Sequence, residues 1–185
     1  MRQLVTMPRL LAVAGVGVVV LAVAMYLFQP WRLFTTVVVN EPPPTVSSAP
    51  RDQADAPLPA TPSAQPASTP AERIEKLARG TFVSHEHSTT GTAEVLRLPD
   101  GSRVLRLVNL NTSDGPDLRV WLSDQPVTRD WFAFDDGRHL ELGHLKGNQG
   151  NANYAIPSEA DLSVLRSVTI WCKRFSVSFG AAPLL

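Results

Sequence analysis

The chain has 185 residues, 17 Lys and Arg against 17 Asp and Glu, one cysteine and 18% charged residues. Average soluble chains carry about 25% charged residues, so part of this chain is unusually apolar. The zero net charge argues against a nucleic-acid partner, because a polyanion is bound by clustered Lys and Arg. A single cysteine excludes an internal disulfide framework and a Cys-rich zinc or iron–sulfur site.

The N-terminal region predicts a transmembrane helix over residues 10–28. Leu10–Phe28 contains 19 consecutive positions without a charge, and about 20 apolar residues cross a bilayer as a helix. Arg2 and Arg9 precede this run and only Arg32 follows closely, so the positive-inside rule places residues 1–9 in the cytoplasm. We therefore expect a single-pass protein of the cell membrane. Its Leu10–Phe28 segment would lie in the lipid bilayer, and the residues after it would be extracytoplasmic.

A cleaved signal peptide is the alternative interpretation of the same run. Ala22-Val23-Ala24 offers an A-x-A cleavage site. The apolar run continues to Phe28, where a mature N-terminus would turn polar, and this favours a retained anchor. Both interpretations export the rest of the chain.

Residues 29–70 are predicted to be an extracytoplasmic linker. Nine of the 16 prolines lie between Glu41 and Pro70, mixed with Ala, Ser and Thr. Such a composition cannot bury a core and favours extended, solvated conformations. The segment is therefore expected to be a semi-stiff tether that holds the following domain away from the bilayer.

A short helix is predicted over residues 71–79. Thr69-Pro70-Ala71-Glu72 has the pattern of an N-cap, a proline at the first helical position and a glutamate that closes a capping box. Ile74, Leu77 and Ala78 then share one helical face.

Residues 80–185 are predicted to form an all-β domain. Apolar residues alternate with polar ones in Leu118–Leu122, Val168–Cys172 and Phe175–Phe179, and Asp100-Gly101 marks a hairpin. Several short strands of this kind, separated by turn signals, indicate an antiparallel β-sandwich or jelly roll.

Cys172 is the candidate redox residue. Its alternation places it on the apolar face with Val168 and Ile170, where a buried, unreactive packing role is one interpretation. A redox thiol or a ligand to a prosthetic group is the other, and the charges of Lys173 and Arg174 would then favour the thiolate. An intermolecular disulfide also remains open, because the exported chain offers Cys172 no partner of its own.

Two further features suggest a binding site. His85 and His87 are spaced i, i+2, which on a strand aims both imidazoles the same way and forms half of a copper, zinc or haem-iron site. Exposed edge histidines are the simpler interpretation. Leu142–Pro157 is dense in Gly and Asn and is predicted to be a tight loop that borders a site.

The domain resembles a known family in the order and spacing of its motifs. Matching segments include Gly80-Thr81-Phe82, Asn111–Leu118, Leu142–Gly147, Gly150–Pro157 and Ser167–Phe179. Together they are similar to the DM-thirteen domain, an electron-transfer domain also found beside DOMON domains in animal Skeletor-like proteins. The resemblance covers essentially all of residues 80–185.

The resemblance implies a β-rich module whose single cysteine acts in redox chemistry, as a thiol or as the attachment point of a group such as haem. The matching cysteine is Cys172, with Trp171, Lys173 and Arg174 beside it. His87 matches a histidine that is frequent in the family, whereas His85 falls where glycine or a polar residue is usual, which weakens the paired metal site. Haem or copper is thus a possible cofactor, and its identity stays open.

These observations predict a membrane-anchored extracytoplasmic electron-transfer module that acts through Cys172. No DOMON or cytochrome segment accompanies the domain in this sequence, so its electron donor is expected to be a separate redox partner protein. A module of this kind would be a redox component rather than a stand-alone enzyme. The alternative is a non-catalytic binding or envelope-organising β domain in which Cys172 is buried packing.

Overall fold

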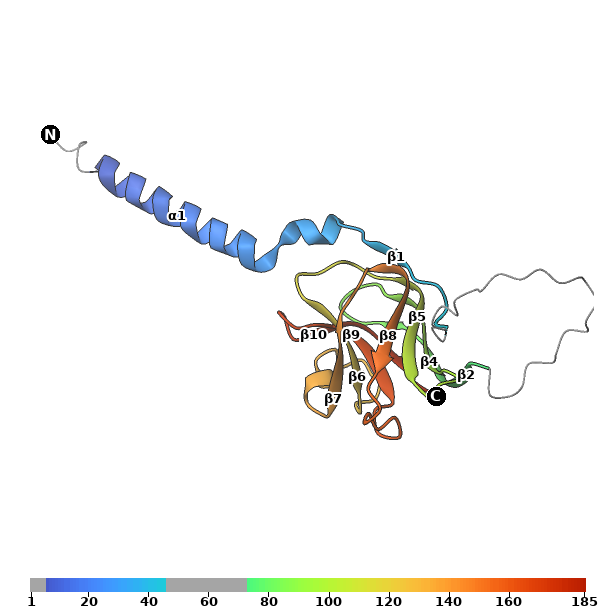
Figure 1. Cartoon of the computed structure of the whole chain (residues 1–185). Helices are drawn as coiled ribbons and strands as arrows, with labels where there is room; N and C mark the ends of the chain where they lie inside the picture. Colours follow the sequence, from blue (N-terminus) through green and yellow to red (C-terminus); the bar gives the residue numbers. More distant parts are fainter. Residues whose placement is uncertain (1–5, 46–72) are drawn as a thin grey trace, which may run out of the picture.

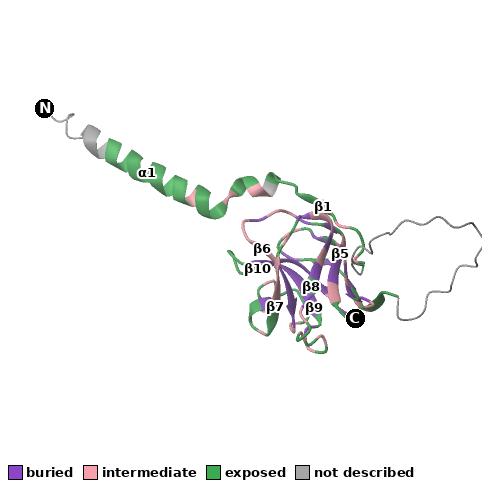
Figure 2. Ribbon diagram, in the orientation of Figure 1, coloured by how far each residue is buried: buried purple, intermediate pink, exposed green. Residues whose placement is uncertain are grey.

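A long N-terminal helix projects from a β domain in the computed structural model, which describes residues 6–45 and 73–185 (Figure 1). The helix α1 spans Thr6–Phe28, and a short 3-10 helix, Pro30–Phe34, leads from it to the domain. The stretch Leu11–Arg32 is long and apolar enough to cross a membrane, and residues 11–28 of α1 are exposed except the half-buried Ala24 (Figure 2). This length and composition suit a membrane anchor or a signal sequence alike.

The β domain consists of two five-stranded sheets. The first has the order β1 (Val38–Asn40), β8 (Gln149–Ile156), β5 (Arg103–Asn111), β4 (Thr90–Arg97) and β2 (Glu75–Thr81). The second has the order β3 (Val83–Ser84), β10 (Val177–Pro183), β9 (Ser167–Cys172), β6 (Leu118–Ser123) and β7 (His139–His144). Neighbouring strands are antiparallel except β1 and β8, which are parallel. The prediction of a sandwich-like β domain is confirmed.

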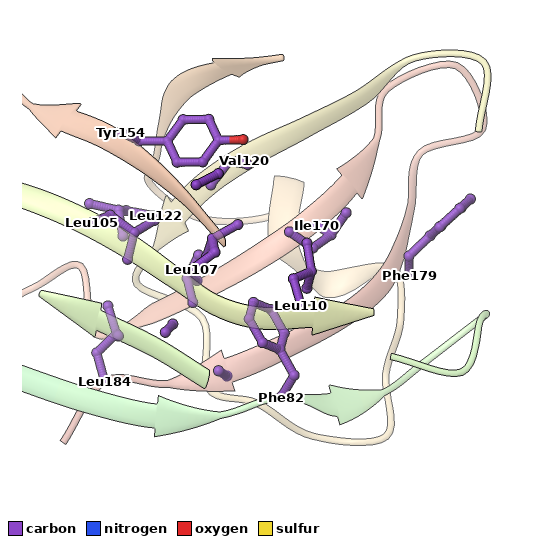
Figure 3. Close-up of a cluster of buried hydrophobic side chains, with 14 of the residues drawn as sticks. Phe82, Leu105, Leu107, Leu110, Val120, Leu122, Tyr154, Ile170, Phe179 and Leu184 are labelled. Atoms are coloured by element: carbon purple, nitrogen blue, oxygen red, sulfur yellow. The ribbon is translucent and has the colours of Figure 1, made fainter. Parts of the chain in front are cut away.

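The core lies between the two sheets (Figure 3). Leu105 and Leu107 of β5 face Leu122 and Ile170 of the second sheet, and all four side chains are fully buried. Burying such apolar surface is the main favourable contribution to folding. The apolar residues of the alternating pattern in the sequence are therefore the ones that face the core.

The outer face of the second sheet is also covered. Trp121 and Trp171 point to this face and pack with Ala181 and Phe134 in a second apolar cluster. Phe134 belongs to a short 3-10 helix, Ala133–Asp135, in the segment between β6 and β7. As a result every residue of β9 is buried.

The predicted helix over residues 71–79 is wrong from residue 75 onward, because this part of the chain is the edge strand β2. Its backbone pairs with β4, and a shift in register falls near Leu77. A Cβ added at Gly80 would lie 1.7 Å from the Pro183 carbonyl oxygen, so β2 also presses against the end of β10. Pairing with β4 and contact with the end of β10 outweigh the local capping signals at residues 69–72, which lie outside the described part.

The predicted Gly/Asn loop over Leu142–Pro157 is also wrong, because half of it is the inner strand β8 and its first three residues end β7. Ala152 and Tyr154 point into the core. The Asn151 side chain donates to the Asn40 side chain, and the Asn153 side chain donates to the Pro42 carbonyl oxygen. The amide side chains are therefore placed where the N-terminal segment crosses the sheet.

The linker predicted over residues 29–70 needs correction at its N-terminal end. Residues 38–40 form β1 and extend the first sheet, and the buried Arg106 side chain donates to the carbonyl oxygens of Glu41 and Pro42. Because β1 and β2 lie at opposite edges of one sheet, the intervening residues connect two strands of the same domain. The part of the predicted linker after residue 45 lies outside the described residues. In the described part, residues 29–37 connect α1 to β1.

Candidate functional site

Cys172 is the last residue of β9 and is completely enclosed. It lies opposite Val177 of β10 and Leu118 of β6, and its exposed fraction is 0%. Burial raises the pKa of the Cys172 thiol, and the nearby Asp117 carboxylate adds to the rise. The thiol is therefore protonated at neutral pH.

The two cationic side chains after Cys172 point away from it. Lys173 Nζ lies 3.4 Å from Glu141 on the outer face of the sheet. Arg174 donates to the backbone carbonyl of Leu27 over 2.7 Å. Our expectation that Lys173 and Arg174 favour the thiolate is therefore not met in this conformation, because both charges face other partners.

A cavity of about 360 Å³ lies between the end of α1 and the β domain. Its apolar lining comes from Phe28, Pro116, Phe175, Val177 and Phe179. Cys172 is not among the lining residues, but its cross-strand neighbour Val177 is. The thiol thus does not border the cavity, but a side chain next to it does.

Trp171 lies on the opposite face of β9 from Cys172, within a group of stacked rings. Its ring centroid is 5.1 Å from that of Trp121 and 6.5 Å from that of Phe134. The His139 ring stacks on Trp121 at 4.0 Å. Aromatic pairs at these separations add to the stability gained from burial alone. Trp171 therefore anchors the covering segment of Phe134 to the sheet.

Glu141 of β7 connects this stack to the charged groups around it. Its carboxylate accepts from Arg119 over 2.6 Å and from Trp121 Nε1 over 3.3 Å. Burial alone would raise the pKa of Glu141, but the Trp121 hydrogen bond and the charges of Arg119 and Lys173 lower it. Glu141 was not predicted from the sequence; the alternation of His139 and Glu141 with Leu140 and Leu142 was the signal that could have revealed β7.

His85 and His87 follow β3 along the edge of β10 and make different contacts. His85 is buried, and its Nδ1 lies 2.8 Å from Ser178 Oγ, while its Nε2 has no hydrogen-bond partner among the described residues. The His87 ring packs on Phe179 at 3.9 Å. Burial lowers the pKa of both imidazoles. Metal binding by this pair stays a prediction.

The donor groups around Cys172 do not fit a haem or a copper ion that this residue would hold. Among residues 6–45 and 73–185 there is no group of three or more His, Cys, Asp or Glu side chains able to hold a metal ion. Cys172 is enclosed by apolar side chains of the core, and His85 already bonds to Ser178.

Comparison with known families agrees with this architecture. The family model described as Electron transfer DM13 matches residues 81–184, more than half of the chain. The chain belongs to the DM-thirteen electron-transfer family. No curated protein and no solved structure matches it. Membership supports a redox or electron-transfer role in general terms. The matched range contains Cys172, the aromatic stack and those cavity-lining residues that belong to the β domain.

Proposed function

We propose that this protein is a membrane-anchored, extracytoplasmic electron-transfer module in which Cys172 is the redox-active residue. The family match over residues 81–184 supports electron transfer, and the described chain has one free cysteine. In this proposal α1 anchors the protein in the bilayer through Leu10–Phe28, with residues 1–9 in the cytoplasm. The electron donor or acceptor is a separate redox protein.

The observation that carries the proposal is the position of Cys172 at the end of a strand. Residues 173–176, which follow it, are exposed, and Val177 alongside it borders the cavity. Strand ends and turns open locally at a lower free energy than the centre of a sheet. Access to an enclosed thiol can therefore be controlled by local opening of this β9–β10 turn.

The burial of Cys172 favours a second candidate function. A thiol with an exposed fraction of 0% inside an apolar core is also what packing alone would produce. On that alternative the protein is a non-catalytic binding or envelope-organising β domain.

Thiol reactivity distinguishes the two functions. The full-length protein, isolated from membranes of cells that export it, is treated with a thiol reagent while folded and again after denaturation. The electron-transfer function predicts a measurable reaction in the folded state that Cys172→Ser abolishes. A thiol that is silent until denaturation supports the binding domain instead.

A further inference from the structure

The cavity at the end of α1 has the dimensions and lining of a small-molecule site. Its volume is about 360 Å³, within the roughly 300–1,000 Å³ typical of ligand pockets. The phenyl rings of Phe28, Phe175 and Phe179 form much of its apolar lining. Pockets of this kind bind ligands mainly through apolar surface and orient them with a few polar groups.

Direct contacts hold the two sides of the cavity together. The Phe28 and Phe175 rings stack with centroids 5.8 Å apart, and Arg174 donates to the Leu27 carbonyl oxygen. On the other side Arg32 donates to the Gly115 carbonyl oxygen over 3.1 Å. The cavity is therefore built by the junction between α1 and the domain.

The charges around the cavity favour a neutral ligand. Arg32 is the one cation among the lining residues, and it lies 3.5 Å from Asp114. Glu86 adds a second carboxylate, and burial lowers the pKa of His87 so that its imidazole is neutral at pH 7. An anionic head group such as a phosphate would meet no net positive charge here.

His87 supplies the polar group that could orient such a ligand. Its ring lies against Phe179 and lines the cavity. A neutral imidazole carries one N–H donor and one acceptor nitrogen. Its N–H can therefore donate to a carbonyl oxygen of a flat ring that stacks on the neighbouring phenyl groups.

The position of the cavity indicates how the ligand arrives. Phe28 is both the last residue of α1 and a lining residue, so the cavity lies where the apolar helix ends. A ligand with a ring head group and a long apolar tail could occupy it while its tail remains among the lipids.

We propose that this cavity binds the head group of an isoprenoid quinone. This inference rests on the proposed function, because a quinone would be a lipid-soluble electron carrier that binds at the end of the domain where Cys172 lies. Val177 lines the cavity and pairs with Cys172 across β9 and β10, so the ligand and the thiol share this neighbour. The flat, neutral, carbonyl-bearing ring of a quinone matches the lining, and its tail matches the bilayer.

Titration of the full-length chain in detergent micelles with decyl-ubiquinone tests this proposal. Binding is measured by the quenching of tryptophan fluorescence, since Trp31 lies between the lining residues Pro30 and Arg32. N-acetyltryptophanamide in the same micelles corrects for non-specific quenching. We expect saturable binding that Phe175→Ala weakens by about fivefold or more, whereas Phe132→Ala, which removes an exposed ring outside the cavity, leaves it unchanged.

Two further comparisons identify the ligand class and the residues that bind it. His87→Phe keeps a ring but removes the N–H, so binding is expected to weaken about three- to tenfold, as for loss of one hydrogen bond. Decyl alcohol, which has the tail without the ring, should not compete. Binding that does not saturate, equal effects of Phe175→Ala and Phe132→Ala, or effective competition by decyl alcohol would overturn the proposal.

Cys172→Ser separates this inference from the proposed function. We expect the serine variant to bind decyl-ubiquinone with unchanged affinity, because Cys172 does not line the cavity. Saturable binding together with an inert thiol would therefore retain the quinone site while rejecting electron transfer through Cys172. A reactive thiol without saturable binding would reject the quinone site alone.

Discussion

Cys172 and Val177 face each other directly across β9 and β10, and Val177 also borders the cavity at the end of α1. Side chains in directly opposite positions of an antiparallel pair have Cβ atoms about 4.5–5.5 Å apart. The thiol therefore lies close to a ligand-sized cavity and is nevertheless fully enclosed. Access of a reactant to the Cys172 thiol is therefore expected to depend on Val177.

Shortening Val177 is expected to expose the thiol. Val177→Ala removes two methyl groups from a side chain that both pairs with Cys172 and lines the cavity, so iodoacetamide should alkylate the folded protein about tenfold faster or more. Val168→Ala, which shortens a buried valine elsewhere in the same core, serves as the matched control. Mass spectrometry of the alkylated cysteine gives the rate. Equal acceleration in both variants would show that global loosening, rather than the Val177 barrier, controls access.

The attachment of β1 and the residues around it to the domain is expected to depend on Arg106. The Arg106 side chain donates to Glu41 and Pro42 carbonyls, so Arg106→Ala should release β1 and speed proteolysis within residues 29–45 several-fold. Arg103→Ala provides the control, because Arg103 donates instead to Pro157 and Ser158 carbonyls. Cleavage sites are mapped by mass spectrometry. If the segment is only a tether, both variants will be cut there as fast as the unaltered chain.

The β domain is expected to lie close to the bilayer. With Cys172→Ser as background, a fluorescent label on Phe34→Cys should be quenched by spin-labelled lipids, because Phe34 is 89% exposed and ends the 3-10 helix after α1. A label on Glu159→Cys, between β8 and β9, should remain unquenched, since Figure 1 places this connection far from α1. If neither label is quenched, the domain is held away from the membrane and this prediction is wrong.

Stability is expected to fall as the pH is lowered below about 6.5, the ordinary pKa of histidine. Burial lowers the pKa of His85 in the folded protein, so the unfolded chain binds the proton first and is favoured as the pH falls. The thermal midpoint measured by circular dichroism should drop between pH 7.5 and 5.5, and His85→Gln should flatten that drop. His144→Gln, at a side chain that is 70% exposed, should preserve it. An unaltered slope in the His85 variant would contradict this account.

The sequence predicted those parts of the fold that depend on alternation within one strand. Leu118–Ser123 and Ser167–Cys172 are strands whose apolar positions face the core. The strand expected from Phe175 begins at Val177 instead, because residues 173–176 turn back over the end of β9. Apolar period-two patterns thus located the strands more reliably than their ends.

The parts that the sequence did not predict depend on contacts between distant segments. Gln149–Ile156 has the composition of a loop, yet its asparagine side chains donate to residues 40 and 42 of the N-terminal segment. The capping signals at residues 69–72 are local and gave no indication of the pairing of β2 with β4. The cavity was unpredictable for the same reason, since Phe28, His87 and Phe175 come from three separated parts of the chain.

A redox titration of the full-length protein with and without Cys172 tests the central claim most directly. The protein is purified from membranes in detergent and equilibrated in glutathione buffers of defined potential, and the fraction of Cys172 present as a mixed disulfide with glutathione is measured by mass spectrometry at each one; oxidised glutathione gives up one glutathione as thiol when the other bonds to Cys172. We predict a reversible transition in the unaltered chain that is absent in Cys172→Ser, while circular dichroism shows the same fold for both. Identical titrations of the two proteins would contradict electron transfer through Cys172.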